Sequence, residues 1–276
     1  MTLSVHTNAG ALTALQNLNQ TNRDLNMVQN RVNTGFRVTG AKDNAAIYAI
    51  AQNMRADIGA LNAVDQSLNR AISISDVALA AGEAISDILV QMKEKVLAAN
   101  DSSLDQVSRN AYNEDFVALR NQINTIIENA IFDGANLIDG SVASIEVLAD
   151  AEAQNVITVT SEDLSLSGTI MSITTTMSLT TLTAASSALT ALESSITNVN
   201  AALARIGSTG KTLETHEVFV GKLQDTLETG VGNLVDADLA TESARLQALQ
   251  VQQQLGVQAL SIANQQPQLI LSLFGG

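Results

Sequence analysis

Cysteine and tryptophan are absent from this 276-residue sequence, which also has only one proline, five phenylalanines and two tyrosines. The lack of cysteine excludes a disulfide scaffold and a thiolate metal site. The scarcity of aromatic side chains argues against an aromatic-anchored β-sandwich and indicates a core of Ala, Leu, Ile and Val. Because proline is the residue that most strongly interrupts a helix, a single proline predicts long uninterrupted helices.

Basic residues are also scarce, with 14 Lys and Arg against 28 Asp and Glu and a net charge of −14. This charge repels phosphate backbones and anionic lipids, so neither nucleic acid nor a membrane is expected as a partner. The first ten residues lack a basic stretch followed by an apolar one, and no run of about 18 apolar residues occurs. Neither a Sec-type signal peptide nor a membrane span is therefore expected.

Charged residues are missing from both ends of the chain. Residues 1–22 and residues 246–276 contain no Asp, Glu, Lys or Arg. Because an exposed helix normally carries a charged face, neutral ends with helical periodicity predict segments that other chains bury. In the middle, residues 121–204 hold nine carboxylates and no basic residue. The Ser and Thr of residues 158–190 are typical of a solvated outer surface, with O-glycosylation as the alternative.

Apolar residues recur at heptad spacing in the first half of the chain, which predicts three helices. The first covers residues 11–32 and the second residues 44–99, a length of about 80 Å at 1.5 Å per residue. The third follows a turn, with Ser103 as its N-cap, and ends near Ile131. Small and turn-favouring residues between the first two helices predict a linker over residues 34–43.

The middle of the chain predicts a short region that is not helical. Two Asp-Gly turns begin at Asp133 and Asp139, and β-branched runs surround Val156 and Ile173. Asp-Gly pairs favour tight hairpin turns, and β-branched residues favour strands. We therefore expect a short, variable, β-containing region over residues 132–182.

Helical periodicity returns over residues 183–235, with an expected pause at Gly230 and Gly232. The last helix is expected to begin at residues 236–238. The predicted fold class is mainly α. It is a long antiparallel helical rod or coiled coil of the N- and C-terminal helices, with a small β-hairpin region.

The last helix has two apolar sides. At about 100° per residue, Leu249 and Val257 fall on one side, and Leu255 and Ile262 fall on the opposite side. A helix on the surface of a monomer needs one apolar stripe, so two stripes predict neighbours on both sides. The predicted self-assembly surface combines residues of both ends: Leu18, Leu25, Val28, Val32, Leu246, Leu249, Val251, Leu255, Val257, Leu260 and Ile262.

Motifs for catalysis are incomplete. Residues 207–212 end like a phosphate loop, but Arg205 stands where that loop needs a glycine. His216 and Glu217 begin a zinc-protease motif, but Val220 occupies the place of the second histidine. We therefore expect no enzyme, no metal site and no cofactor, and we expect His216 to be a polar surface residue.

Several motifs together resemble bacterial flagellins. Residues 31–46 closely resemble the N-terminal flagellin signature, and residues 261–267 with 271–274 resemble the C-terminal ending. Phe132 to Gly134 and residues 236–242 match the family as well, and the signature looks most like that of alphaproteobacterial flagellins. The signature and linker residues are Asn33, Gly35, Arg37, Gly40, Lys42, Asp43 and Asn44.

The resemblance implies a structural subunit that polymerises into the flagellar filament used for swimming motility. It implies a hairpin-like molecule with little or no separate outer domain. The domains that it implies are a terminal helical inner core (1–33 and 236–276), a linker (34–43), a helical rod (44–131 and 183–235) and a short variable region (132–182).

The resemblance also implies where the protein works and with which partners. Flagellins leave the cell unfolded through the flagellar type III export apparatus, with a chaperone, and join the extracellular filament beneath its cap. The implied partners are copies of the chain, other flagellins and the hook-filament junction proteins. Two alternatives remain open, a junction protein that only caps hooks and a flagellin with a peptidase insert that depends on His216.

Overall fold

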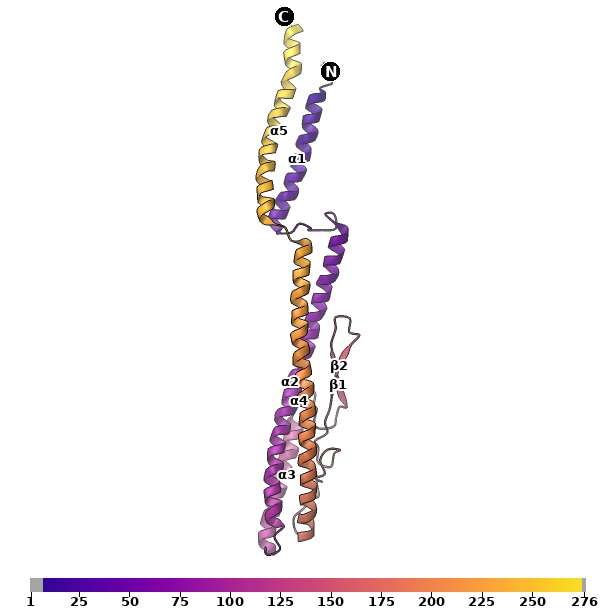
Figure 1. Cartoon of the computed structure of the whole chain (residues 1–276), viewed down its shortest axis with the longest axis vertical. Coiled ribbons are helices and arrows are strands. Elements are labelled where there is room, and N and C mark those ends of the chain that lie inside the picture. Colours follow the sequence, from indigo (N-terminus) through magenta and orange to yellow (C-terminus); the bar gives the residue numbers. More distant parts are fainter. Residues whose placement is uncertain (1–6, 275–276) are drawn as a thin grey trace. The chain divides into compact units, whose positions relative to one another are not determined.

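In the computed structural model, residues 7–274 are described, with their side chains up to residue 265. The described residues form five helices and one two-stranded sheet (Figure 1). This confirms the predicted fold class of a mainly helical protein with a small β-hairpin region. The elements are α1 (Ala9–Thr34), α2 (Ala45–Ala99), α3 (Gln106–Asn129), β1 (Ser144–Leu148), β2 (Val156–Thr160), α4 (Leu182–Val235) and α5 (Leu239–Phe274).

The chain divides into two compact units that differ in charge. Unit 1 comprises Met1–Ala56 and Thr226–Gly276, and unit 2 comprises Asp57–Asp225. Six basic and six acidic residues fall in unit 1, whereas eight basic and 22 acidic residues fall in unit 2. The whole net charge of −14 therefore belongs to unit 2, and the side chains of unit 1 balance to zero.

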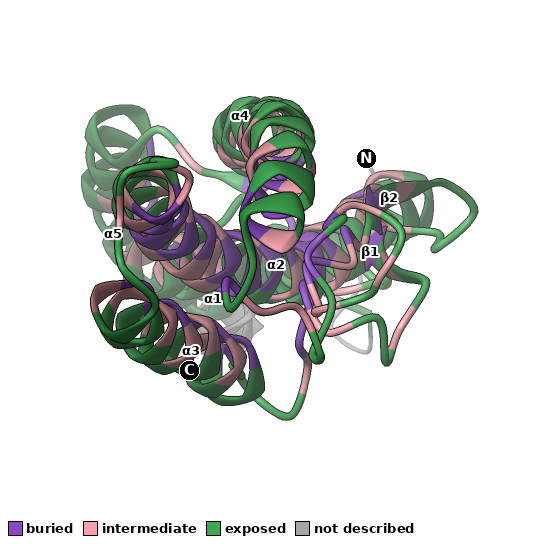
Figure 2. Cartoon of the chain, turned by 90° about the horizontal axis from the view of Figure 1, so that it is seen from below, coloured by how far each residue is buried: buried purple, intermediate pink, exposed green. Residues whose placement is uncertain are grey.

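In unit 2, α2 and α4 run antiparallel. Asn62 of α2 contacts Gln224 of α4 through their side-chain amides at 3.3 Å, and further along α2 Lys93 Nζ lies 3.0 Å from Glu193 Oε1. Figure 2 shows buried residues on the sides of α2, α3 and α4 that face one another, with exposed residues outside. The large, fully buried side chains of this core include Leu68, Ile85, Leu89, Met92, Phe116 and Ile123.

Glycine allows α4 to continue where the sequence predicts a pause. The expected pause at Gly230 and Gly232 is wrong, because α4 is helical without interruption to Val235. A Cβ atom at Gly230 would lie 2.8 Å from Met54 Cε, and one at Gly232 would lie 2.8 Å from a carboxylate oxygen of Asp236. These glycines therefore permit close packing inside a helix, although each lowers helix propensity by about 1 kcal/mol relative to alanine.

The N-cap of α3 is Asp105, and the prediction of Ser103 is wrong. Asp105 Oδ1 accepts a hydrogen bond from the Ser108 amide at 2.9 Å, which is the usual capping contact. Ser103 belongs to the preceding turn, where its amide and its hydroxyl both donate to Asp101 Oδ1 at 2.8 Å. The helix can begin only after this turn is complete.

The β-hairpin occupies the first part of the predicted β-containing region. Strands β1 and β2 pair antiparallel in a register that joins Ser144 to Thr160 and Leu148 to Val156. One side chain of each strand is buried, Val147 in β1 and Val159 in β2. The Asp-Gly turn at Asp133 precedes the hairpin, and both of its residues have a positive φ, as the sequence pattern favours.

Of the two β-branched runs, the one around Val156 forms a strand and the one around Ile173 does not. The carbonyl of Ile173 accepts from the amide of Ser167 at 2.9 Å, and the carbonyl of Ile170 accepts from the Asn198 side chain at 3.1 Å. The backbone of this segment therefore bonds to its own turn and to α4 instead of a neighbouring strand. The side chain of Ile173 is buried, which explains its apolar character.

Two residues of the incomplete catalytic motifs hold the β-containing region to α4. Arg205 makes two hydrogen bonds of 2.6 Å to the two carboxylate oxygens of Glu162. His216 is half-buried, and its Nε2 lies 2.7 Å from the carbonyl of Ala149. Residues 207–212 lie inside α4, where a phosphate loop cannot form.

Candidate self-assembly surface

The two terminal helices of unit 1 pair antiparallel. Near the start of α1, Asn8 Nδ2 donates to the carbonyl of Ala263 at 2.7 Å. Further along α1, Gln253 Nε2 of α5 donates to Asn22 Oδ1 at 2.7 Å. Asn8 also caps α1, because its side chain accepts from the amide of Ala11 at 3.0 Å. Uncharged amide groups thus join α1 to α5 at two levels along the pair.

A small apolar cluster joins the two helices nearer to the linker. It consists of Leu25 and Val28 of α1 and Leu249 of α5, with Val32 and Leu246 packed against it. Heptad spacing brings the residues of each helix to one side. Among the side chains described, the cluster is the most buried apolar part of the pair, because the apolar residues further from the linker, up to residue 265, are half-buried or exposed.

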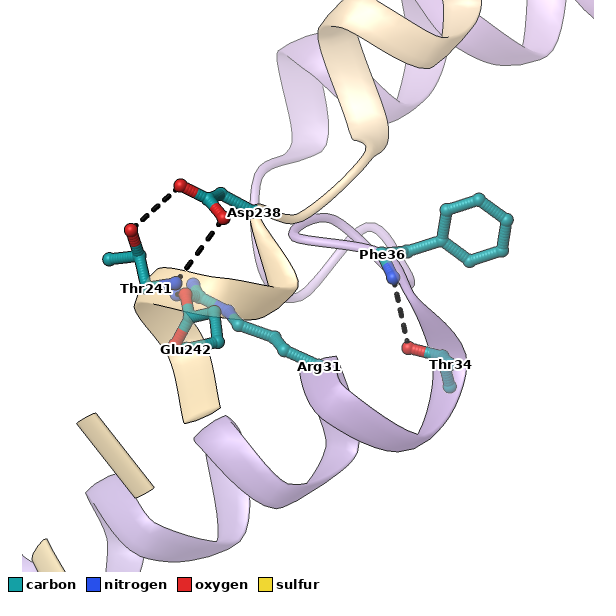
Figure 3. A network of polar contacts seen from close by, with 6 residues as sticks. All are labelled: Arg31, Thr34, Phe36, Asp238, Thr241 and Glu242. Carbon is teal, nitrogen blue, oxygen red and sulfur yellow. Dashed lines mark hydrogen bonds and ion pairs between the residues drawn. The ribbon is translucent and has the colours of Figure 1, made fainter. Parts of the chain in front are cut away.

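An ion pair joins α1 to the first turn of α5. Arg31 Nη1 lies 3.0 Å from Glu242 Oε1, and only 8% of Glu242 is exposed. Figure 3 shows Arg31 reaching across to Glu242, beside the hydrogen bonds that Thr241 donates to Asp238 at the helix start. An acidic residue in the first turn of a helix is also favoured by the helix dipole. Both charges of this pair are therefore compensated.

Residues of the linker pair with the connection between α4 and α5. Gly35 ends α1 with a φ of 75° in the left-handed region, a conformation that glycine adopts without strain. Its carbonyl accepts from the amide of Ala237 at 2.8 Å. Arg37 donates its amide to the carbonyl of Val235 at 2.6 Å and its guanidinium to the carbonyl of Leu234 at 2.9 Å.

Other signature residues shape the turn that leads into α2. Asp43 Oδ2 accepts from the amide of Thr39 at 2.9 Å and from its hydroxyl at 2.7 Å. These hydrogen bonds lower the pKa of Asp43 below its usual value, with the side-chain bond as the largest cause. Asn44 Oδ1 accepts from the amide of Ile47 at 3.1 Å and caps α2, and Gly40 accepts from the amide of Asp43 at 3.1 Å. Asn33 and Lys42 are exposed.

The predicted assembly residues fall into three groups in the structure. Leu25, Val28 and Leu249 are buried between the helices, while Leu18, Val32, Leu246 and Leu260 are half-buried. The four others are exposed by more than half of their surface: Val251, Leu255, Val257 and Ile262.

Val257 is exposed, although the sequence pattern groups it with Leu249, which is buried against α1. The residues of α5 that are half-buried or buried alternate by three and four positions, from Leu246 and Leu249 to Gln253, Gly256 and Leu260. Sequence reasoning missed Gln253 and Gly256 because it searched for apolar side chains only. Continuing the same three-and-four spacing through polar residues would have found both.

Gly256 brings α5 close to α1. A Cβ atom at this position would lie 3.2 Å from Leu18 Cδ1, which is tighter than ordinary packing. The small residue therefore permits the approach of the two helices where few large side chains separate them.

Terminal helices that pair with each other, carry long stretches without charge and leave apolar side chains exposed define a structural, self-associating class of protein. The match of residues 5–143 to the bacterial flagellin N-terminal helical region and of residues 189–274 to the C-terminal helical region places the chain in the bacterial flagellin family.

Individual relatives agree over the full length of the chain. Flagellin FljM of Caulobacter vibrioides is 51% identical over 271 residues, which is 98% of each chain. A flagellin of Brucella melitensis is 38% identical over 282 residues, 99% of each chain. The alphaproteobacterial resemblance predicted from the signature is thus confirmed. The chain is a structural subunit of the flagellar filament, which works outside the cell in swimming motility.

A solved structure of a putative flagellar hook-associated protein from Vibrio parahaemolyticus has a similar fold. It matches 70% of this chain and 100% of its own length with a TM-score of 0.58 and 14% sequence identity. This likeness concerns the fold alone. Nothing in it favours a hook-associated function over the filament function of the much closer relatives.

The N-cap of α5 makes one pH-dependent prediction. The hydroxyl and amide of Thr241 and the amide of Ala240 donate to Asp238, and these bonds lower its pKa below the ordinary value of 3.8. A carboxylate with a lowered pKa in the folded state stabilises that state above its unfolded pKa, and this contribution disappears as the pH falls through the folded pKa. Filaments are therefore expected to dissociate progressively below about pH 4, as measured by sedimentation.

The substitution Asp238→Asn distinguishes the effect of the negative charge from the effect of the capping hydrogen bonds. Asparagine can still accept from the amides of Ala240 and Thr241 through its one side-chain oxygen, although not from the Thr241 hydroxyl. It does not titrate in this range, so its filaments should dissociate at a lower pH than those of the wild type. Asp238→Ala removes the cap and should weaken the filaments at neutral pH. An unchanged acid midpoint in Asp238→Asn would assign the acid sensitivity to other carboxylates.

Proposed function

We propose that α1 and α5 together form the surface through which copies of this chain polymerise. The observation that carries the proposal is the exposure of Val251, Leu255 and Ile262 on a stretch of α5 without any charge. Such a stripe on a monomer would stay in contact with water, whereas neighbouring copies would bury it. On this proposal the inner core is formed by 1–33 and 236–276, the connection by 34–43, the rod by 44–131 and 183–235, and the variable surface by 132–182.

The charge difference between the two units supports this arrangement. An unpaired charge in a densely packed core costs several kcal/mol, and the side chains of unit 1 balance to zero. Unit 2 carries the net charge of −14, which water and salt screen on an outer surface. The balanced charge of unit 1 is therefore compatible with dense packing in a filament, and the negative charge of unit 2 is compatible with contact with water.

We also infer that the two ends become ordered on assembly. Fixing a residue costs about 1 to 2 kcal/mol of conformational entropy, yet among the apolar residues of the pair whose side chains are described, up to residue 265, only Leu25, Val28 and Leu249 are buried. A single pair of helices thus buries little apolar surface to offset the entropy. Neighbouring copies would supply the remaining burial.

Ends that order late suit a chain that leaves the cell unfolded. We propose export through the flagellar type III apparatus with a chaperone, addition beneath the filament cap, and contact with the hook-filament junction proteins, as the family resemblance suggests. Other flagellins of the same cell would share the filament. The protein would act without catalysis and without a cofactor.

Limited digestion with trypsin, followed by seeded filament growth in the electron microscope, tests the proposal. Arg23 and Arg245 are exposed on the terminal helices and should be cut first in the free chain. Arg109 provides an internal control. It is buried and donates to the carbonyls of Ala99 and Asp101 at 3.0 and 2.9 Å, so cleavage there should be slow.

The trimmed chain should keep unit 2 intact and should no longer add to wild-type seeds. Equal cleavage rates at Arg23 and Arg109 would contradict late ordering of the ends. Normal growth of the trimmed chain would contradict the assembly surface itself.

A further inference from the structure

One face of the α1 and α5 pair is hollowed. A groove of about 460 Å³ runs between the helices near the free ends. This volume far exceeds the roughly 30 Å³ share of one water molecule in the liquid, so protein side chains are a suitable occupant. The residues that line it are uncharged, and most of them are small, such as Gly10 and Ala14 of α1 and Gly256, Ala259 and Ala263 of α5; Asn17 also lines it, and Leu18 and Leu255 add apolar walls.

The opposite face of the same pair carries two exposed apolar side chains. Leu15 is 43% exposed and Val257 is 54% exposed. Leu15 is two residues from Asn17, and Val257 is two residues from Ala259. At about 100° per residue, two positions correspond to about 200°, so each apolar residue lies on the flank of its helix away from the groove. We call Leu15 and Val257 the ridge.

The ridge and the groove lie at the same level along the pair. Leu18 is next to Gly256, and the helices are antiparallel. Leu15 lies three residues from Leu18, and Val257 lies one residue from Gly256, both in the same direction along the pair. At 1.5 Å per residue, the two ridge residues are therefore within about 3 Å of each other along the axis. The ridge stands directly behind the groove.

We propose that the ridge of one copy docks into the groove of the next copy, an inference that rests on the proposed function. A second copy is the occupant because both surfaces lie in the two stretches that have no charged residue, so neither meets an unpaired charge on contact. The family to which the chain belongs also forms structures from many copies. A contact between two different faces of the same molecule is heterologous and leaves a free groove and a free ridge, so it can repeat without end.

Two variants separate the two faces. Ala259→Leu fills the groove with a larger apolar side chain, while α5 keeps its helix propensity and its hydrophobicity. The double substitution Leu15→Gln with Val257→Gln removes the apolar ridge without adding charge. Neither variant alone should extend wild-type seeds in electron microscopy, whereas wild-type protein in the same buffer grows long filaments. Failure of the wild type to grow would instead contradict the proposed function.

Mixing each variant with an excess of wild-type protein gives the decisive result. Because the contact is head-to-tail, a growing end presents either a groove or a ridge. One variant should therefore add to that end and stop growth at a ratio well below one to one, while the other should have no effect. Equal effects of the two variants, or normal growth of either one alone, would overturn the docking of ridge into groove.

Ala111→Leu is the matched control for the filled groove. Ala111 is exposed on α3, outside the two terminal helices, so the same added side chain should leave filament growth within about twofold of the wild type. Loss of growth in this variant as well would overturn the assignment, because an added side chain anywhere on the surface would then explain the result.

Discussion

Val251→Asp is expected to abolish filament growth. Val251 is 56% exposed on the side of α5 opposite to the residues that contact α1. If neighbouring copies cover this side, the new carboxylate is buried without a partner, which costs about 3 to 5 kcal/mol. At about 1.4 kcal/mol per tenfold, the lowest concentration that supports growth should rise by more than about a hundredfold, as measured by sedimentation of seeded samples.

Val107→Asp is the matched control for this substitution. Val107 is 77% exposed near the start of α3, where the helix dipole favours an acidic side chain. Its filaments should grow as the wild type does. Growth of Val251→Asp at the wild-type concentration would show that this side of α5 stays in contact with water in the filament.

Phe116→Ala is expected to cause the largest loss of stability in unit 2. Phe116 is fully buried on α3, and its truncation would remove apolar burial and leave a cavity in the core. Such substitutions lower the free energy of unfolding by about 3 to 5 kcal/mol. Denaturant unfolding followed by circular dichroism should report this loss as a lower midpoint with an unchanged slope.

Truncation of an exposed residue in the same helix gives the comparison. Val107→Ala should change the free energy of unfolding by no more than about 0.5 kcal/mol. A loss of less than about 1 kcal/mol in Phe116→Ala would mean that the surrounding side chains collapse into the vacated space.

Helix positions could be predicted from the sequence because helical periodicity is a local property. The apolar spacing around Leu61 and Leu68 gave the extent of α2, and the turn residues around Gly35 gave the break after α1. The fold class and the hairpin followed from the same local patterns. These features depend on residues that are close in the sequence.

The parts that could not be predicted depend on residues far apart in the sequence. Gly230 on its own predicts a break in the helix. In the structure the side chain of Met54 lies beside it, which explains the glycine. Ile173 has the character of a strand residue, yet its backbone bonds within a turn. In the candidate site, Gly256 gains its role only from Leu18 on the other terminal helix. Periodicity within one helix contains no information about these partners.

The two connections beside α1 and α5 have a mechanical consequence. A rotating filament transmits torque through every subunit, and a single-stranded connection could swivel about its backbone bonds. Here the segment from Gly35 to Arg37 is bonded to the segment from Leu234 to Ala237 by main-chain hydrogen bonds and by the Arg37 guanidinium. Twisting one segment against the other would require these bonds to break together. The two bonded segments therefore resist twisting better than either segment alone.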